Sequence, residues 1–279
     1  MSLNHTLIDW VKNPDVTQGF TWNPITGCLN HVDGICKGGG FPCYAYKLAH
    51  GRTKNLYLAN DNLAPLQEGM KPYSWNERVT DPFYPREWFA RRERGLESKK
   101  SKGVFVCDMS DLFGIGIPES WTDCVLQTIK VFPEHRFYLL TKQPQNLAKF
   151  SPFPDNCWVG VTVTANGFAP EAYYNLSSLL AKVKYISFEP LLGQIGTDEL
   201  RNLSQVTDWW IVGSQTKPYK PPRIEWITEI VEAADKSGVK VFMKNNLWPI
   251  FEKGTVACRT DKTCLVSNGT LRQEFPRKD

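Results

Sequence analysis

The chain has 279 residues, of which 42% are hydrophobic and 22% are charged, and its formal net charge is +4. These proportions are typical of a soluble globular protein with a sizeable core, and the sequence shows neither a solenoid repeat nor a low-complexity segment. The mild positive charge permits an anionic substrate or a nucleic acid as partner without requiring one.

No apolar stretch approaches the roughly 20 residues that a membrane-spanning helix needs, so we expect no membrane partner. The first residues lack the basic and apolar regions of a signal peptide. These features predict a cytoplasmic protein. In that reducing compartment, clustered cysteines more often bind metal or react than form disulfides.

The first predicted strand covers residues 20–24, and a loop with three cysteines follows it. Cys28, Cys36 and Cys43 lie within residues 26–45, and residues 44–49 read as a short helix. Residues 52–102 have no clear pattern, although an eighth strand could lie near residues 78–80 and a helix over residues 85–100.

From residue 103 onward, short apolar runs alternate with helical patterns. The runs are nearly continuous in apolar character, which is typical of parallel strands buried on both faces. They cover residues 104–107, 136–140, 158–161, 184–188, 209–212 and 239–243. Helices are predicted over residues 118–131, 170–182 and 223–236, the last ending at Gly238.

Strands that alternate with helices predict an α/β protein with a parallel sheet. The best fit is a (β/α) barrel of the TIM type, partial or complete, with six to eight strands. A doubly wound sheet is the alternative, but it would carry a glycine-rich loop where this chain has the cysteines. We expect residues 1–251 to form the barrel, and residues 252–279 to form a small extension with a hairpin at Asn268-Gly269.

Three thiolates in one loop can bind three irons of a [4Fe–4S] cluster and leave the fourth iron open for a ligand. Zinc is the main alternative, because His31 in the same loop would complete a Cys₃His set. Buried core thiols are a third interpretation.

Polar residues follow each predicted strand of the barrel. In this fold the active-site residues lie at these strand ends. They include Asp108, Ser110 and Asp111, then Thr141 and Lys142, Thr162, Glu189, Gly213 and Ser214, and Lys244. Asp108, Ser110 and Asp111 could instead orient the loop or cap a helix. Glu189 and Lys244 could simply pair with each other, and Lys142 could be a solvated lysine.

Several motifs, taken in order, resemble the phage Gp37/Gp68 family of three-Cys-motif proteins. The resemblance covers about residues 20–250. The motifs are Trp22-Asn23-Pro24-Ile25-Thr26-Gly27-Cys28, Cys43-Tyr44-Ala45, residues 104–113, Leu140-Thr141-Lys142-Gln143-Pro144, residues 158–162, residues 187–193 and residues 208–213. That family is similar to radical S-adenosylmethionine (SAM) enzymes and, distantly, to the spore photoproduct lyase group.

The resemblance implies a [4Fe–4S] cluster on Cys28, Cys36 and Cys43, with SAM bound at the open iron. One electron from a donor would cleave SAM to a 5′-deoxyadenosyl radical, which abstracts hydrogen from the substrate. Asp108, Ser110, Asp111, Thr141, Thr162, Gly213 and Ser214 would bind the cofactor. Lys142, Glu189 and Lys244 would act on the substrate, which could be a nucleotide or a nucleic-acid base.

Two other functions are compatible with the sequence. The first is a zinc- or cluster-stabilised barrel that binds nucleic acid or a partner protein. The second is a metal-assisted hydrolase that uses Asp111, Glu189 and Lys244. The chain has only four histidines, and none has the spacing of a typical metal site.

Overall fold

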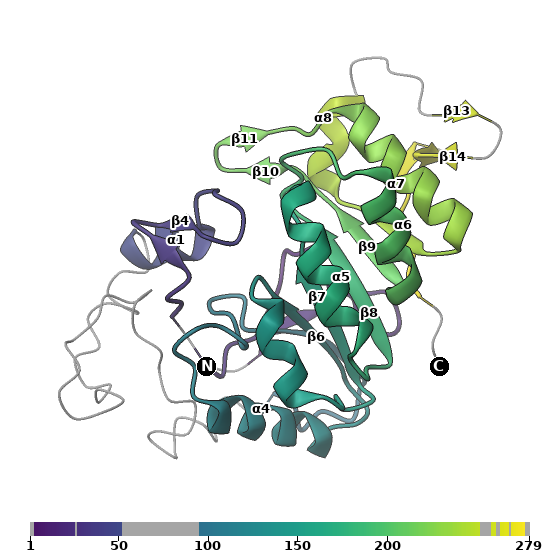
Figure 1. Ribbon diagram of the computed structural model, residues 1–279. Helices are drawn as coiled ribbons and strands as arrows, with labels where there is room; N and C mark the ends of the chain where they lie inside the picture. Colours follow the sequence, from purple (N-terminus) through teal and green to yellow (C-terminus); the bar gives the residue numbers. More distant parts are fainter. Residues whose placement is uncertain are drawn as a thin grey trace. The chain divides into compact units, whose positions relative to one another are not determined.

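The computed structural model describes residues 3–25, 27–51, 95–251, 258–260, 263–267 and 269–276 (Figure 1). The chain forms two compact units, Met1–Cys157 and Trp158–Asp279. The strand suggested near residues 78–80 lies outside the described residues. Of the helix suggested over residues 85–100, only residues 95–100 are described, and these are not helical.

The first unit contains strands in the order β1-β2-β5-β6. β1 runs antiparallel to β2, whereas β2, β5 and β6 are parallel. The elements are β1 (Asn4–His5), β2 (Phe20–Trp22), β3 (His31–Val32), β4 (Ile35–Cys36), α1 (Tyr44–His50), β5 (Gly103–Val106), α4 (Glu119–Val131), β6 (Arg136–Thr141) and the 3₁₀ helix η1 (Pro144–Phe150).

The second unit contains the parallel strands β7-β8-β9-β12 with helices between them. The elements are β7 (Cys157–Thr162), η2 (Asn166–Phe168), α5 (Ala169–Ser177), β8 (Val183–Phe188), α6 (Thr197–Val206), β9 (Trp209–Val212), β10 (Gln215–Thr216), β11 (Tyr219–Lys220), α7 (Ile224–Ser237), β12 (Lys240–Met243), η3 (Asn245–Leu247), α8 (Trp248–Phe251), β13 (Cys258–Thr260), β14 (Thr263–Cys264), β15 (Val266–Ser267) and β16 (Thr270–Leu271).

The core of the second unit follows from its sequence pattern. All four residues of β9 are buried, and α7 buries Ile227, Ile230, Val231 and Ala234 on one face. Gly238 ends α7 with φ 75°, a left-handed conformation that suits glycine. In Figure 1, α5, α6 and α7 lie side by side over the strands, in the order of the chain.

These observations confirm a mixed α/β protein whose strands are mostly parallel, and closure into a barrel stays a prediction. The division at residue 251 also stays a prediction. Within the described part of the C-terminal segment, Gln273 forms a bridge with Phe242 of β12, and the ring of Phe275 packs on Trp209. The predicted hairpin is present as β15 and β16.

The helix predicted over residues 170–182 ends early, at Ser177. The hydroxyls of Ser177 and Ser178 donate to the carbonyl oxygens of Tyr174 and Asn175, at 2.8 and 3.3 Å. Such hydroxyls compete with the helical backbone pattern and favour helix ends. No described helix is long and apolar enough to cross a membrane.

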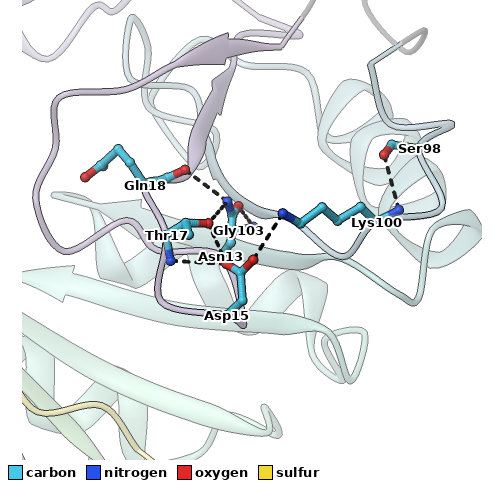
Figure 2. A network of polar contacts seen from close by, with 7 residues as sticks. All are labelled: Asn13, Asp15, Thr17, Gln18, Ser98, Lys100 and Gly103. Atoms are coloured by element: carbon cyan, nitrogen blue, oxygen red, sulfur yellow. Dashed lines mark hydrogen bonds and ion pairs between the residues drawn. The ribbon is translucent and has the colours of Figure 1, made fainter.

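A polar network fixes the start of β5, the strand that leads to the predicted site (Figure 2). Asn13 is buried; its side chain accepts a hydrogen bond from the Gly103 N–H at 2.8 Å and donates to Thr17 and to the Gln18 carbonyl. A Cβ at Gly103 would collide with the backbone of Lys12, so the strand can approach this closely only with glycine.

We expect Asn13→Leu to lower the free energy of unfolding by about 1–3 kcal/mol, because the buried Gly103 N–H loses its acceptor. Urea unfolding monitored by circular dichroism measures this change. Lys100→Met is the control, because its exposed ion pair with Asp15 contributes at most about 1 kcal/mol. Equal effects of the two substitutions would contradict the importance of Asn13.

Candidate functional site

The insertion between Cys28 and Cys36 forms a β-hairpin. β3 and β4 pair antiparallel, with His31 opposite Cys36. Asp33 and Gly34 form the turn and both have positive φ, 46° and 79°. A two-residue turn of this kind matches the twist of paired strands, and Asp-Gly is one of its preferred sequences.

The hairpin also fixes the segment that carries Cys43. The N–H of Cys43 donates to the Gly34 carbonyl at 2.8 Å, and the N–H of Cys36 donates to the Phe41 carbonyl at 2.9 Å. Cys43 immediately precedes α1, and the ring of Tyr46 in α1 packs against Gly34. The backbone of this loop is therefore ordered by its own hydrogen bonds.

The base of the loop is attached to the end of β5. The N–H of Gly27 donates to the Met109 carbonyl at 3.2 Å, and the hydroxyl of Ser110 donates to the Gly27 carbonyl at 2.6 Å. Asn23 donates to the carboxylate of Asp108, and its carbonyl accepts from the Met109 N–H at 3.1 Å. Ser110, predicted to bind cofactor, therefore positions the cysteine loop, and the carboxylate of Asp108 is held by Asn23, just before the loop.

Asp111 connects the ends of β5 and β6. One carboxylate oxygen accepts from the Phe113 N–H at 3.1 Å. The other accepts from the Thr141 hydroxyl and the Lys142 N–H, each at 3.0 Å. Asp111 therefore stabilises a local turn rather than capping a helix, and it also holds the following strand end in place.

Lys142, which directly follows β6, packs against the cysteine loop. A Cβ at Gly38 would come within 2.6 Å of the Lys142 Cβ, and the ammonium of Lys142 is 5.9 Å from the centroid of the Phe41 ring. Its positive charge lowers the pKa of Cys36, although burial has the larger effect and raises it. Lys142 is thus an electrostatic neighbour of the thiols rather than an isolated surface lysine.

Burial and neighbouring charges affect the thiols of Cys28 and Cys36. Burial, with added contributions from Asp111, Cys36 and Cys43, raises the pKa of Cys28 to about 12. Backbone N–H groups point at two of the sulfurs: that of Asn30 lies 3.4 Å from Cys28 Sγ, and that of Gly38 stabilises the Cys36 thiolate. Donors of this kind surround thiolates that bind metal.

The described residues contain no group of three His, Cys, Asp or Glu side chains arranged around one metal ion. His31 Nδ1 accepts a hydrogen bond from the Gly34 N–H at 3.3 Å. A neutral imidazole that accepts at Nδ1 carries its proton on Nε2, so in this arrangement Nε2 presents no lone pair to a metal.

The remaining predicted residues lie in the second unit. Glu189 and Lys244 form an ion pair, as the alternative interpretation of these residues proposed, and their side chains are only 22% and 13% exposed. They meet over Gly213, where a Cβ would lie 2.9 Å from Lys244 Cδ and 3.2 Å from Glu189 Cγ. Glycine at this position therefore makes room for the pair.

A row of buried hydroxyls lies at the ends of β7, β8 and β9. Thr162 and Ser187 are opposite each other on neighbouring strands. Their hydroxyls, and those of Thr164 and Ser214, have no hydrogen-bond partner within the described part of the protein, and each residue is at most 5% exposed. Buried polar groups are normally satisfied, so these hydroxyls are suited to meet water or a ligand.

The comparisons with known proteins identify the family. The model of a family described as "Protein of unknown function (DUF5131)" matches residues 5–276. The chain belongs to this family. Neither a curated protein nor a solved structure matches it.

Sequence reasoning missed several residues that the structure places in these sites. Asn23 orients Asp108 and Met109, and Asn246 accepts from the Ser214 N–H at 3.0 Å. Thr164 and Ser187 belong to the hydroxyl row. Each of these residues stands at the end of a predicted strand, so its position was a usable signal, but its partner could not be read from the sequence.

The raised pKa of Cys28 predicts slow alkylation in the metal-free protein. At pH 7.5 iodoacetamide should label the exposed Cys124 much faster than Cys28, because only the thiolate reacts. Between pH 7.5 and 9.5 the rate at Cys28 should rise by about a hundredfold, since its thiolate fraction grows tenfold per unit well below the pKa. Peptide mass spectrometry follows both sites. Labelling of Cys28 as fast as Cys124 at pH 7.5 would contradict this arrangement.

The ion pair of the second unit predicts a coupled effect on stability. Glu189→Leu should lower the free energy of unfolding by about 1–3 kcal/mol, because it leaves the mostly buried ammonium of Lys244 without its carboxylate. The double substitution Glu189→Leu/Lys244→Met should cost less than the single one. Urea unfolding tests this, with Lys149→Met in an exposed pair as the control. If the double substitution lowered the free energy of unfolding by the sum of the losses from the two single substitutions, the two residues would not be coupled.

Proposed function

We propose that this protein is an iron–sulfur enzyme of the radical SAM type. The observation that carries the proposal is the cysteine loop: Cys28, Cys36 and Cys43 belong to one loop that follows the first parallel strand, and its hairpin sets His31 opposite Cys36 and bonds the backbone of Cys43 to Gly34. Closure of the strands into a (β/α) barrel is part of this proposal, as is a cytoplasmic location.

The residues of the loop fit a cluster better than a single zinc ion. A cubane cluster takes each thiolate on a different iron, so the three sulfurs need not converge on one point, whereas tetrahedral zinc requires convergence. When bound to Cys28, Cys36 and Cys43, the cluster would supply the one electron needed for reductive cleavage of SAM, the chemistry that permits hydrogen abstraction from a substrate.

The protein's own residues would prepare this chemistry. Asp111, Thr141 and Ser110 hold the loop and the end of β6, and Lys142 places a positive charge beside Cys36. The hydroxyls of Thr162 and Ser187, with the Glu189–Lys244 pair, are the groups we assign to SAM or substrate. The substrate class that we propose is a nucleotide or nucleic-acid base, and a low-potential one-electron donor is required.

The hydrolase alternative is less well supported. A general base needs an accessible lone pair, but Asp111 is buried and its two oxygens already accept three hydrogen bonds. Glu189 is engaged with Lys244.

Anaerobic reconstitution with iron and sulfide tests the proposal. We expect a broad absorption band near ~400 nm that bleaches with dithionite, and release of 5′-deoxyadenosine from SAM. Cys36→Ala should abolish both signals, because one thiolate ligand is lost. Cys124→Ala, which removes an exposed cysteine from α4, is the matched control and should retain them.

Two results would overturn the proposal. One is an absorption spectrum without the band, together with stoichiometric zinc in the purified protein. The other is a band of equal intensity in the Cys36→Ala variant. A cluster without release of 5′-deoxyadenosine would reject SAM cleavage but not cluster binding.

A further inference from the structure

A cavity of about 310 Å³ lies in the first unit, between residues 112–117 and η1. Its size is at the lower end of the range for small-molecule pockets. Phe113 and Phe150 contribute aromatic walls, with ring centroids 5.6 Å apart. The charged lining residues are Glu119 and Lys149, which pair with each other at 2.7 Å and are largely exposed. The interior of the pocket is therefore suited to a neutral, partly aromatic ligand.

Gln143 lines this cavity and carries an unpartnered donor. It is only 6% exposed, and its Oε1 accepts a hydrogen bond from the Ile115 N–H at 3.0 Å. That bond fixes the orientation of the amide, because the opposite orientation would place two donors together. Nε2 is buried and has no hydrogen-bond partner in the described structure. Such a group is costly unless an acceptor meets it.

Two neighbours complete the chemistry of the pocket. Gly114 leaves space beside the amide, since a Cβ there would lie 3.2 Å from Gln143 Nε2 and 2.9 Å from the Asp111 carbonyl oxygen. Asn146 also lines the cavity, and its Nδ2 donates to the Phe113 carbonyl at 2.8 Å. Its Oδ1 is then the atom that Asn146 can offer to a ligand as an acceptor.

We propose that this cavity binds a nucleobase. A nucleobase is flat and uncharged, and it carries hydrogen-bond acceptors and donors along its edges. Amide side chains pair with such edges, and aromatic side chains stack on the faces of bases. The donor of Gln143, the acceptor of Asn146 and the rings of Phe113 and Phe150 supply these three kinds of contact. The base could belong to a free nucleoside or to an unpaired residue of a nucleic acid.

Calorimetric titration of the full-length, metal-free protein tests this proposal independently of the cysteine site. The probes are adenosine, cytidine, guanosine and uridine, and short single-stranded DNA homopolymers. We expect at least one nucleoside to bind with a dissociation constant below about 1 mM, as for weak specific ligands. Tighter binding of the matching oligonucleotide, weakened by salt, would identify nucleic acid as the source of the base. Equal or weaker binding would identify the free nucleoside.

Two substitutions locate the binding in this cavity. Gln143→Met should weaken it by about tenfold or more, because the donor is lost. Phe150→Leu removes a stacking surface and should weaken it by about fivefold or more. It also keeps the test decisive if Gln143→Met fails to fold. Gln194→Met is the matched control, because the amide of Gln194 donates to Glu229 on an exposed surface.

Two results would overturn the proposal. The first is the absence of binding of every nucleoside and oligonucleotide to the unaltered protein. The second is binding that is unchanged in both Gln143→Met and Phe150→Leu.

Discussion

The buried carboxylate of Asp111 is the constraint on which the first unit's site depends. A carboxylate is expensive to bury unless donors surround it, and here three donors from two strand ends meet it. One of them is the Lys142 N–H. The carboxylate therefore fixes the position of Lys142, whose side chain packs against Gly38 of the cysteine loop. The Thr141 hydroxyl then accepts from the Gln143 N–H at 2.9 Å, which extends the same network to the wall of the cavity. The negative charge also raises the pKa of Cys28, which favours the neutral thiol until a metal replaces the proton.

Contacts within the chain define the backbone of the described part of the cysteine loop. These contacts are its hairpin, its attachment to Met109 and Ser110, and the packing of Tyr46 on Gly34. The glycines at 38 and 40 serve the same purpose: the first admits the stem of Lys142, and the second has φ 67°.

The sequence predicted those parts of the fold that depend on local pattern. The apolar strands, the buried face of α7 and its end at Gly238 follow from periodicity and capping, and the structure confirms them. The hairpin of β3 and β4 was missed although Asp33-Gly34 is a turn signal, because its strands are only two residues long. The site was harder to predict, since its partners are distant in the chain. Ser110 bonds to Gly27 and Thr141 bonds to Asp111, and no spacing rule reveals such pairs. The three cysteines could be singled out because their shared loop is itself a local pattern.

Hydrogen-bond satisfaction separates residues that support a site from residues that can contact a ligand. The hydroxyls of Ser110 and Thr141 and the carboxylate of Asp111 form hydrogen bonds with other groups of the protein. The hydroxyls of Thr162 and Ser187 and the amide donor of Gln143 are equally buried but have no partner among the described residues. Evolution of a stable fold alone would favour apolar side chains at such positions, because an unsatisfied buried group costs about 1–3 kcal/mol. Polar side chains retained there are better explained by an occupant that satisfies them. The ligand contacts of this protein should therefore be sought at its unsatisfied groups, and its satisfied strand-end residues should be regarded as their support.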